Sequence, residues 1–224
     1  MAITKAFKMS QGGLGSEILI DADGDTSITA DTDDQIDIKV GGSDVGKITT
    51  AGIEGSNLVL LSSSVLGADA STIEITAATL TTDFTQHRLI LKLRPKTDGQ
   101  AVVIRVRDDS ASLLTGVSNY GQQTYQGGGT DFNDSTVSGL STVSTIGNAT
   151  GENGLLILDI GHLRTAAKMT TILFRGLFAY DDAGIFVTGG VGVKVPEDNQ
   201  GLSIFFGSGD IEAASEFALY GVKS

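Results

Sequence analysis

The sequence predicts an all-β protein, with a small extended β region at the N-terminus followed by a β-sandwich. Apolar and polar residues alternate in many short runs, and Gly, Asp, Asn and Ser clusters separate these runs, as expected for strands joined by tight turns. Helical spacing is rare, and only residues 163–169 and 211–216 suggest a helical turn or two. The chain has 224 residues, 40% of them hydrophobic, which is enough to form a core.

The N-terminal third contains a predicted hairpin. Ile36, Ile38 and Val40 alternate with Asp37 and Lys39, Gly-Gly-Ser-Asp follows at 41–44, and a second strand is expected at 45–49. Further strands are predicted at 18–20, 58–61 and 72–76. Residues 1–80 hold 12 acids and 4 bases, which is two thirds of the net charge of −12. This shift predicts two domains, an N-terminal β region at 1–80 and a sandwich at 81–224.

The apolar rows of residues 17–61 are too few to enclose themselves. An isolated hairpin is marginally stable in water, so this region needs a partner to be ordered. Packing several copies about an axis would bury the rows and remove the exposed strand edges. We therefore expect an oligomer.

Residues 88–107 predict a second hairpin with a charged face. Its cations are Arg88, Lys92, Arg94, Arg105 and Arg107, and they alternate with the apolar rows at 89–93 and 102–106. Pairing 94 with 101 and 88 with 107 would gather all five cations on one face, where like charges repel unless carboxylates neutralise them. We expect at least two of them to contact Asp or Glu. The alternative is a solvated basic face.

The remaining strands are expected at 155–160, 171–180, 185–188, 192–195, 202–206 and 217–222. In the longest of them one face carries Ile172, Phe174, Gly176, Phe178 and Tyr180. We expect this aromatic row to line the inner face of the sandwich, because large rings dominate burial. The glycine in the row would let a facing side chain approach closely.

One acidic loop is a candidate calcium site. In D-A-D-G-D-T the acids are Asp21, Asp23 and Asp25, which look like the start of a calcium loop. An EF-hand needs Gly at position six and Glu at position twelve, but this sequence has Thr26 and Thr32 there. Turn formation is therefore the preferred interpretation, and calcium binding, with oxygens also from Asp31, Asp33 and Asp34, is the alternative.

No enzyme, catalytic residue, cofactor site or metal site is predicted. The chain has no Cys, only His87 and His162, and neither a G-x-S-x-G nor an H-E-x-x-H motif. The acidic pairs at 108–109 and 181–182 are interpreted as turns, and the three glycines at 127–129 as a surface loop. The charge of −12 argues against nucleic acid and anionic membranes as partners.

Two stretches resemble structural proteins of tailed phages. DADGDTSITADTDDQIDIKVGGSDVGKITTAGI, residues 21–53, resembles a repeat unit of phage fibre proteins. HRLILKLRPKTDGQAVVIRVRDDS at 87–110, SNYGQQ at 118–123 and LSIFFGSGDIEAASEFALYGVKS at 202–224 are similar to the opening and closing strands of a jelly-roll-like domain of phage virion proteins. The resemblance implies a jelly-roll-like sandwich and a homotrimer. The family often repeats the fibre unit, and its single copy here implies a short projection.

Several functions remain open at this point. The first is a tail-associated short fibre or receptor-binding projection, and the alternative is a capsid decoration or head-fibre protein; copy number per virion would separate them. A polysaccharide-degrading tailspike is a remote alternative, because such enzymes need a long grooved body. A bacterial surface lectin would need aromatic platforms, which a chain without Trp supplies poorly. The expected partners are copies of itself, other tail or capsid proteins, and a host-surface receptor or glycan, all at the virion exterior.

Overall fold

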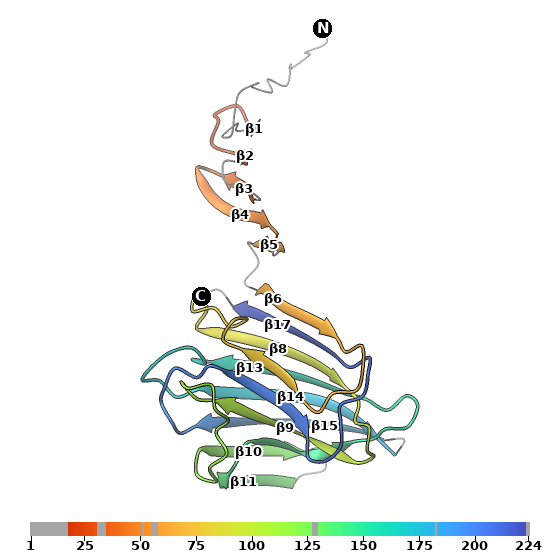
Figure 1. The fold of residues 1–224 in the computed structure, drawn as a ribbon. Coiled ribbons are helices and arrows are strands. Elements are labelled where there is room, and N and C mark those ends of the chain that lie inside the picture. Colours follow the sequence, from red (N-terminus) through yellow and green to blue (C-terminus); the bar gives the residue numbers. More distant parts are fainter. Residues whose placement is uncertain are drawn as a thin grey trace. The chain divides into compact units, whose positions relative to one another are not determined.

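The computed structural model describes residues 18–30, 35–50, 52–54, 58–126, 130–181 and 183–222. Every regular element in these ranges is a β-strand, which confirms the predicted all-β class. The chain divides into two compact units, Met1–Val59 and Leu60–Ser224 (Figure 1). Within the described ranges, no helix is long and apolar enough to cross a membrane.

The first unit is an antiparallel sheet in which each strand pairs with the next along the chain. Its strands are β1 (Ile18–Leu19), β2 (Ser27–Thr29), β3 (Gln35–Val40), β4 (Ser43–Thr49) and β5 (Gly52–Glu54). The predicted hairpin is confirmed as β3 and β4. Gly41 and Gly42 join them with φ angles of 58° and 73°, a left-handed conformation that glycine adopts without steric cost.

The second unit is a jelly-roll-like β-sandwich of two antiparallel sheets. The eight-stranded sheet has the order β11-β10-β15-β14-β13-β8-β17-β6, and the four-stranded sheet has the order β12-β9-β16-β7. The strands are β6 (Leu58–Val65), β7 (Ile73–Thr76), β8 (Gln86–Leu93), β9 (Gln100–Arg107), β10 (Tyr120–Gln126), β11 (Thr130–Val137), β12 (Leu140–Ile146), β13 (Gly154–Gly161), β14 (Thr171–Tyr180), β15 (Ala183–Val193), β16 (Gly201–Phe206) and β17 (Glu216–Val222).

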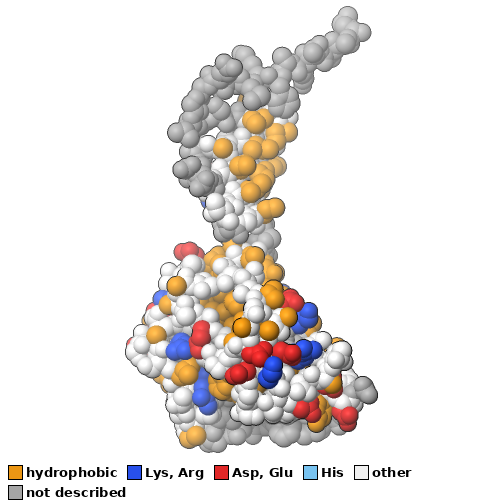
Figure 2. Space-filling model, turned by 45° about the vertical axis from the view of Figure 1, so that its right-hand side comes forward, with side chains coloured by type: hydrophobic (Ala, Val, Ile, Leu, Met, Phe, Trp, Pro, Cys, Tyr) orange, Lys and Arg blue, Asp and Glu red, His pale blue; other side chains and the backbone are white. Residues whose placement is uncertain are grey.

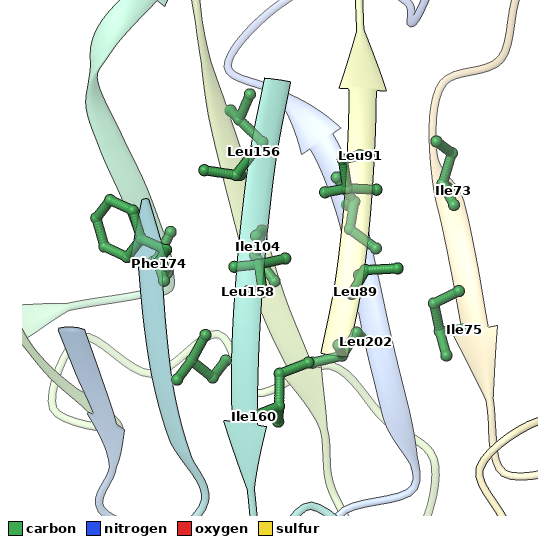
Figure 3. Close-up of a cluster of buried hydrophobic side chains, with 14 of the residues drawn as sticks. Ile73, Ile75, Leu89, Leu91, Ile104, Leu156, Leu158, Ile160, Phe174 and Leu202 are labelled. Atoms are coloured by element: carbon green, nitrogen blue, oxygen red, sulfur yellow. The ribbon is translucent and has the colours of Figure 1, made fainter. Parts of the chain in front are cut away.

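The core lies between the two sheets and is built from alternate residues of their strands (Figure 3). Leu89 and Leu158 point inward from the eight-stranded sheet, and Ile104 and Leu202 point inward from the four-stranded sheet. The aromatic row of β14 lines this core as predicted, since Ile172, Phe174 and Phe178 are buried. Tyr180, at the end of the row, is half-buried.

The boundary between the units lies about twenty residues earlier than the predicted position near residue 80. The reason is that β7 pairs with β16 in the four-stranded sheet. Ala70 also forms a bridge to Ile211, near the other end of the chain. Residues 60–80 are therefore part of the sandwich, and their Ser/Thr/Ala-rich composition reflects an edge strand and turns rather than a linker.

The expected hairpin at 88–107 does not form. β8 lies between β13 and β17 in the eight-stranded sheet, whereas β9 lies between β12 and β16 in the four-stranded sheet. The connection at 94–99 therefore passes from one sheet to the other instead of turning back within one sheet. The two apolar rows nevertheless face the core, so the prediction of faces was correct and the prediction of pairing was wrong.

Three other expectations differ from the structure. Residues 163–169 and 211–216 are turns rather than helix, because Ala167 and Ala214 have positive φ angles of 61° and 67° that interrupt a right-handed helix. β15 contains the strand expected at 185–188 and the first two residues of the strand expected at 192–195, and it ends at Val193. Between residues 107 and 154, where no strand was expected, the chain forms β10, β11 and β12. The three glycines at 127–129 lie outside the described residues.

Candidate interaction surfaces

The five cations of 88–107 lie on the outer faces of two different sheets. Arg88 and Lys92 belong to the eight-stranded sheet, Arg94 follows at the end of β8, and Arg105 and Arg107 belong to the four-stranded sheet. The single cationic face expected from the sequence is therefore absent. The repulsion that it would have caused does not arise.

The expectation that these cations contact carboxylates is confirmed. Nε of Arg88 donates to Oδ1 of Asp159 at 2.7 Å, and Nζ of Lys92 donates to Oε1 of Glu216 at 2.9 Å. Both carboxylates are the direct cross-strand neighbours of the cations they bind. Two further pairs join distant segments, Arg94 with Glu212 and Arg107 with Glu74 at 2.7 Å. The hydrogen bonds from Arg94 also lower the pKa of the Glu212 carboxyl.

These ion pairs lie on outer faces and are partly exposed. Figure 2 shows basic and acidic side chains beside one another on the surface of the sandwich. Exposed pairs of this kind stabilise a fold by about 1 kcal/mol at most. Arg105 has no carboxylate partner in the described part of the chain. Its Nε donates to the carbonyl of Ser138 at 3.0 Å, and its guanidinium lies 5.1 Å from the ring centroid of Phe205. All five cations of 88–107 are therefore bound by groups of the same chain.

The acidic loop at 21–26 folds onto its own backbone. Asp21, Asp23 and Asp25 bring carboxylate oxygens within 4.8 Å of one another, and all three residues are exposed. Oδ1 of Asp21 accepts hydrogen bonds from the backbone N–H groups of Gly24 and Thr26, at 3.1 and 3.2 Å. Hydrogen bonds to Thr26 and Gly24 lower the pKa of Asp21 to about 2. The Asp21 side chain therefore stabilises the turn of its own loop by accepting from backbone N–H groups three and five residues further along the chain. Asp31, Asp33 and Asp34 lie outside the described residues.

The two histidines do not form a catalytic arrangement. The His87 ring is buried against Phe84, and neither of its nitrogens has a hydrogen-bond partner in the described ranges. Desolvation, together with the positive charge of Arg164, lowers the pKa of His87 to about 4. Asp159, which stands near His162 in the sequence, pairs with Arg88 instead. Among the described residues, neither histidine is hydrogen-bonded to a carboxylate.

The acidic pair at 108–109 is part of a turn, as expected. Oδ1 of Asp108 accepts hydrogen bonds from the backbone N–H groups of Ser110 and Ser112, at 3.0 and 2.8 Å. A hydrogen bond from the Ser110 hydroxyl, together with these two backbone bonds, lowers the pKa of Asp108. Of the second pair, Asp181 has a positive φ of 50° and its neighbour at 182 lies outside the described residues.

The first unit presents a face of isoleucines. Its register places Ile18, Ile28 and Ile38 opposite one another across β1, β2 and β3. A second row places Ile36, Ile48 and Ile53 opposite one another across β3, β4 and β5. Four of the six are exposed, Ile53 by 71%. Hydrophobic side chains are visible along one side of this unit (Figure 2). Ser27, Asp37, Lys39 and Lys47 point to the opposite, polar face.

The eight-stranded sheet presents a second apolar surface on its outer face. The exposed residues are Leu155 on β13, Leu173 and Leu177 on β14, and Phe186 on β15. Beside them lies an open hollow of about 690 Å³, lined by residues of β10, β14 and β15. This surface was not singled out from the sequence, although the signal was present, because β14 is apolar on both of its faces.

Comparisons with known proteins identify no family. No protein-family model matches the chain, and no curated protein matches it. Among solved structures, the chain is similar to the galectin LEC-6 of Caenorhabditis elegans, with 14% identity and a TM-score of 0.29, over 72% of this chain and 96% of that one. It is also similar to a structure of infectious bursal disease virus, Gt strain, with 12% identity and a TM-score of 0.14, over 84% of this chain and 51% of that one. Scores this low carry no argument about function.

Proposed function

We propose that this protein is a non-enzymatic structural protein of a tailed-phage virion, a homotrimeric short fibre or receptor-binding projection attached to the tail. The observation that carries the proposal is the isoleucine face of the first unit. A protein whose N-terminal sheet needs other copies to cover it is suited to forming a projection by self-association. The resemblance of residues 21–53 to a phage fibre unit supports the same function.

The isoleucine face favours copies of the same chain as its cover. The face carries six isoleucines in two rows. When copies of the chain are related by a rotation axis, the isoleucines of one copy can pack against the isoleucines of the next, so the surface is self-complementary. Burying the remaining exposed part of each side chain contributes roughly 1 kcal/mol per isoleucine. The opposite face is polar, with Asp37 and Lys47 as cross-strand neighbours. The trimeric state is taken from the family resemblance, whereas the self-association itself is argued from the exposed isoleucine face.

A capsid decoration or head-fibre protein is the second candidate. The net charge of −12 and the single fibre-like unit favour it, since an acidic, short protein suits an exposed shell. Quantitative mass spectrometry of purified virions separates the two. A few to some tens of copies per particle supports the tail projection, and hundreds of copies support the capsid protein.

The self-association is tested with two variants of matched charge. We expect light scattering to give the mass of a trimer for the full chain. Ile48→Asp places a carboxylate in the isoleucine face and should shift the protein toward monomer, because an unpaired charge is costly to bury. Lys47→Gln changes the net charge by the same amount on the polar face and should leave the mass unchanged. A monomeric wild-type protein, or equal masses for the two variants, contradicts the proposal.

A further inference from the structure

The outer face of the eight-stranded sheet is apolar where a sandwich is usually polar. Outer faces of antiparallel sheets meet water and alternate with the core-facing residues. On β14, however, the outward side chains include Leu173 and Leu177, which are 65% and 57% exposed. The four-stranded sheet supplies a comparison within the same molecule. Its outer face carries Glu74, Arg107 and Ser203, joined by hydrogen bonds.

The strand register gathers the apolar side chains into one patch. Leu155, Leu177 and Phe186 are direct cross-strand neighbours on β13, β14 and β15. Leu173 lies on the same face of β14, and Ile157 lies on the same face of β13. We call these five residues the outer apolar patch. Contiguous exposed patches of this kind mark interaction sites rather than ordinary surface.

An arginine stands at the centre of the outer apolar patch. Arg175 is the cross-strand neighbour of Ile157 and Thr188, and it lies between the two leucines of β14. The structure gives it no ion pair or hydrogen bond among the described residues, in contrast to Arg88 on the same face. Arginine and large apolar side chains are enriched at the centres of protein–protein interfaces. The occupant of this face must therefore offer apolar surface and a carboxylate.

The hollow beside the patch provides room for side chains of that occupant. Its floor is formed by glycines of β10 and β15, and a side chain at Gly190 would come within 3.1 Å of Leu173. The rest of the lining is uncharged, with Gln123, Tyr125 and Thr188 offering amide and hydroxyl groups. This shape suits inserted apolar or neutral side chains of another protein.

We infer that the outer apolar patch, with Arg175 at its centre, is an interface between copies of this chain within the proposed oligomer. The inference rests on the self-association in the proposed function, but it uses a different surface. Charge complementarity supports a second copy as the occupant, because each chain carries 27 acids against 15 bases and can present a carboxylate to Arg175. Placing two patches face to face about a two-fold axis would oppose Arg175 to itself. The contact is therefore heterologous, a type that closes into rings such as a trimer.

The absence of cysteine allows a direct test on the full chain. Leu177→Cys places a thiol in the patch, and Thr76→Cys places one on the exposed outer face of the four-stranded sheet. The rate of maleimide labelling is measured in the native protein and divided by the rate in the unfolded chain. We expect labelling at 177 to be at least ten-fold slower than at 76. A Leu177→Cys variant that is folded but monomeric supports the inference as well, because the leucine then contributes to assembly.

Two outcomes separate the possible failures. Equal labelling of both thiols in a protein that has the mass of a trimer overturns the inference and leaves the proposed self-association intact. A monomeric wild-type protein overturns both. Arg175→Glu supplies a second readout, since we expect it to raise the concentration for half-assembly at least ten-fold. Arg175→Lys keeps the positive charge, so its concentration for half-assembly should lie between those of the wild-type protein and Arg175→Glu. Equal concentrations for the two variants argue against a carboxylate partner.

Discussion

At the scale of single residues, the aromatic row of β14 determines the packing of the sandwich. Phe174 is 3% exposed, and its ring lies against the backbone at Gly189 so closely that a Cβ there would come within 2.7 Å of the ring. Phe174→Ala should therefore lower the free energy of unfolding by about 3–5 kcal/mol, because a rigid strand pair cannot close the cavity. Chemical denaturation of both proteins measures the difference. Val117→Ala, at a residue that is 63% exposed and lies outside both proposed interfaces, is the control, and similar losses for both would mean that Phe174 is not buried.

His87 makes stability depend on pH. Its pKa in the folded protein is about 4, whereas an unfolded histidine has a pKa near 6.5. Protonation therefore favours unfolding. The contribution of the neutral ring is fully present above pH 6.5 and is lost as the pH falls toward 4, by about 3 kcal/mol at most. No carboxylate contacts this ring among the described residues, and Arg164 opposes its protonation.

The measurement compares the wild-type protein with His87→Leu, whose side chain fits the apolar row of β8. Carboxylates also titrate below pH 5, so the useful quantity is the difference between the unfolding free energies of the two proteins from pH 7 to pH 4. We expect the wild-type protein to lose stability more steeply over this interval. Parallel curves would mean that the ring is hydrated in the folded protein.

At the scale of elements, alternation predicted which side of each strand faces the core, but it did not predict which strands β8 and β9 pair with. Leu89 and Ile104 both lie in the core, as the sequence indicated, yet β8 and β9 belong to opposite sheets. Alternation is a local property that depends only on which side of a strand meets the core. A turn such as Pro95 to Gly99 can reverse the chain within one sheet or carry it between two sheets. The choice is made by strands far along the chain, such as β13 and β17, which flank β8.

The elements that were missed carried weak apolar signals. β10 reads Tyr-Gly-Gln-Gln-Thr-Tyr-Gln, and its inward positions include Gln122 and Thr124, which are buried but polar. Gln122 is satisfied by Ser141, whose N–H donates to Oε1 at 2.9 Å. A buried strand can therefore look like a loop in the sequence when long-range hydrogen bonds satisfy its polar groups. For the candidate surfaces, periodicity predicted the apolar row of β3, with Ile36 and Ile38, whereas the place of Ile28 in the isoleucine face and the outer apolar patch both required the strand register.

At the scale of the whole molecule, the net charge opposes the association that the apolar surfaces favour. Each copy carries −12, so bringing three copies together is resisted by long-range repulsion. The repulsion extends over about 30 Å at 0.01 M salt and about 10 Å at 0.1 M salt. In the proposed oligomer, the isoleucine face and the outer apolar patch supply the hydrophobic attraction, which moderate salt does not weaken.

Assembly should therefore strengthen with salt. Between 0.01 and 0.1 M NaCl, we expect the concentration for half-assembly to fall, as measured by light scattering on dilution. Arg175→Gln removes one electrostatic attraction between copies, so its assembly should be weaker than that of the wild-type protein at both salt concentrations. Because the variant has no such ion pair for salt to screen, its assembly should strengthen more steeply with salt. Lys47→Gln has the same change in net charge away from both surfaces and should follow the wild-type slope closely. Assembly that weakens steadily with salt would mean that ion pairs, rather than apolar faces, hold the copies together.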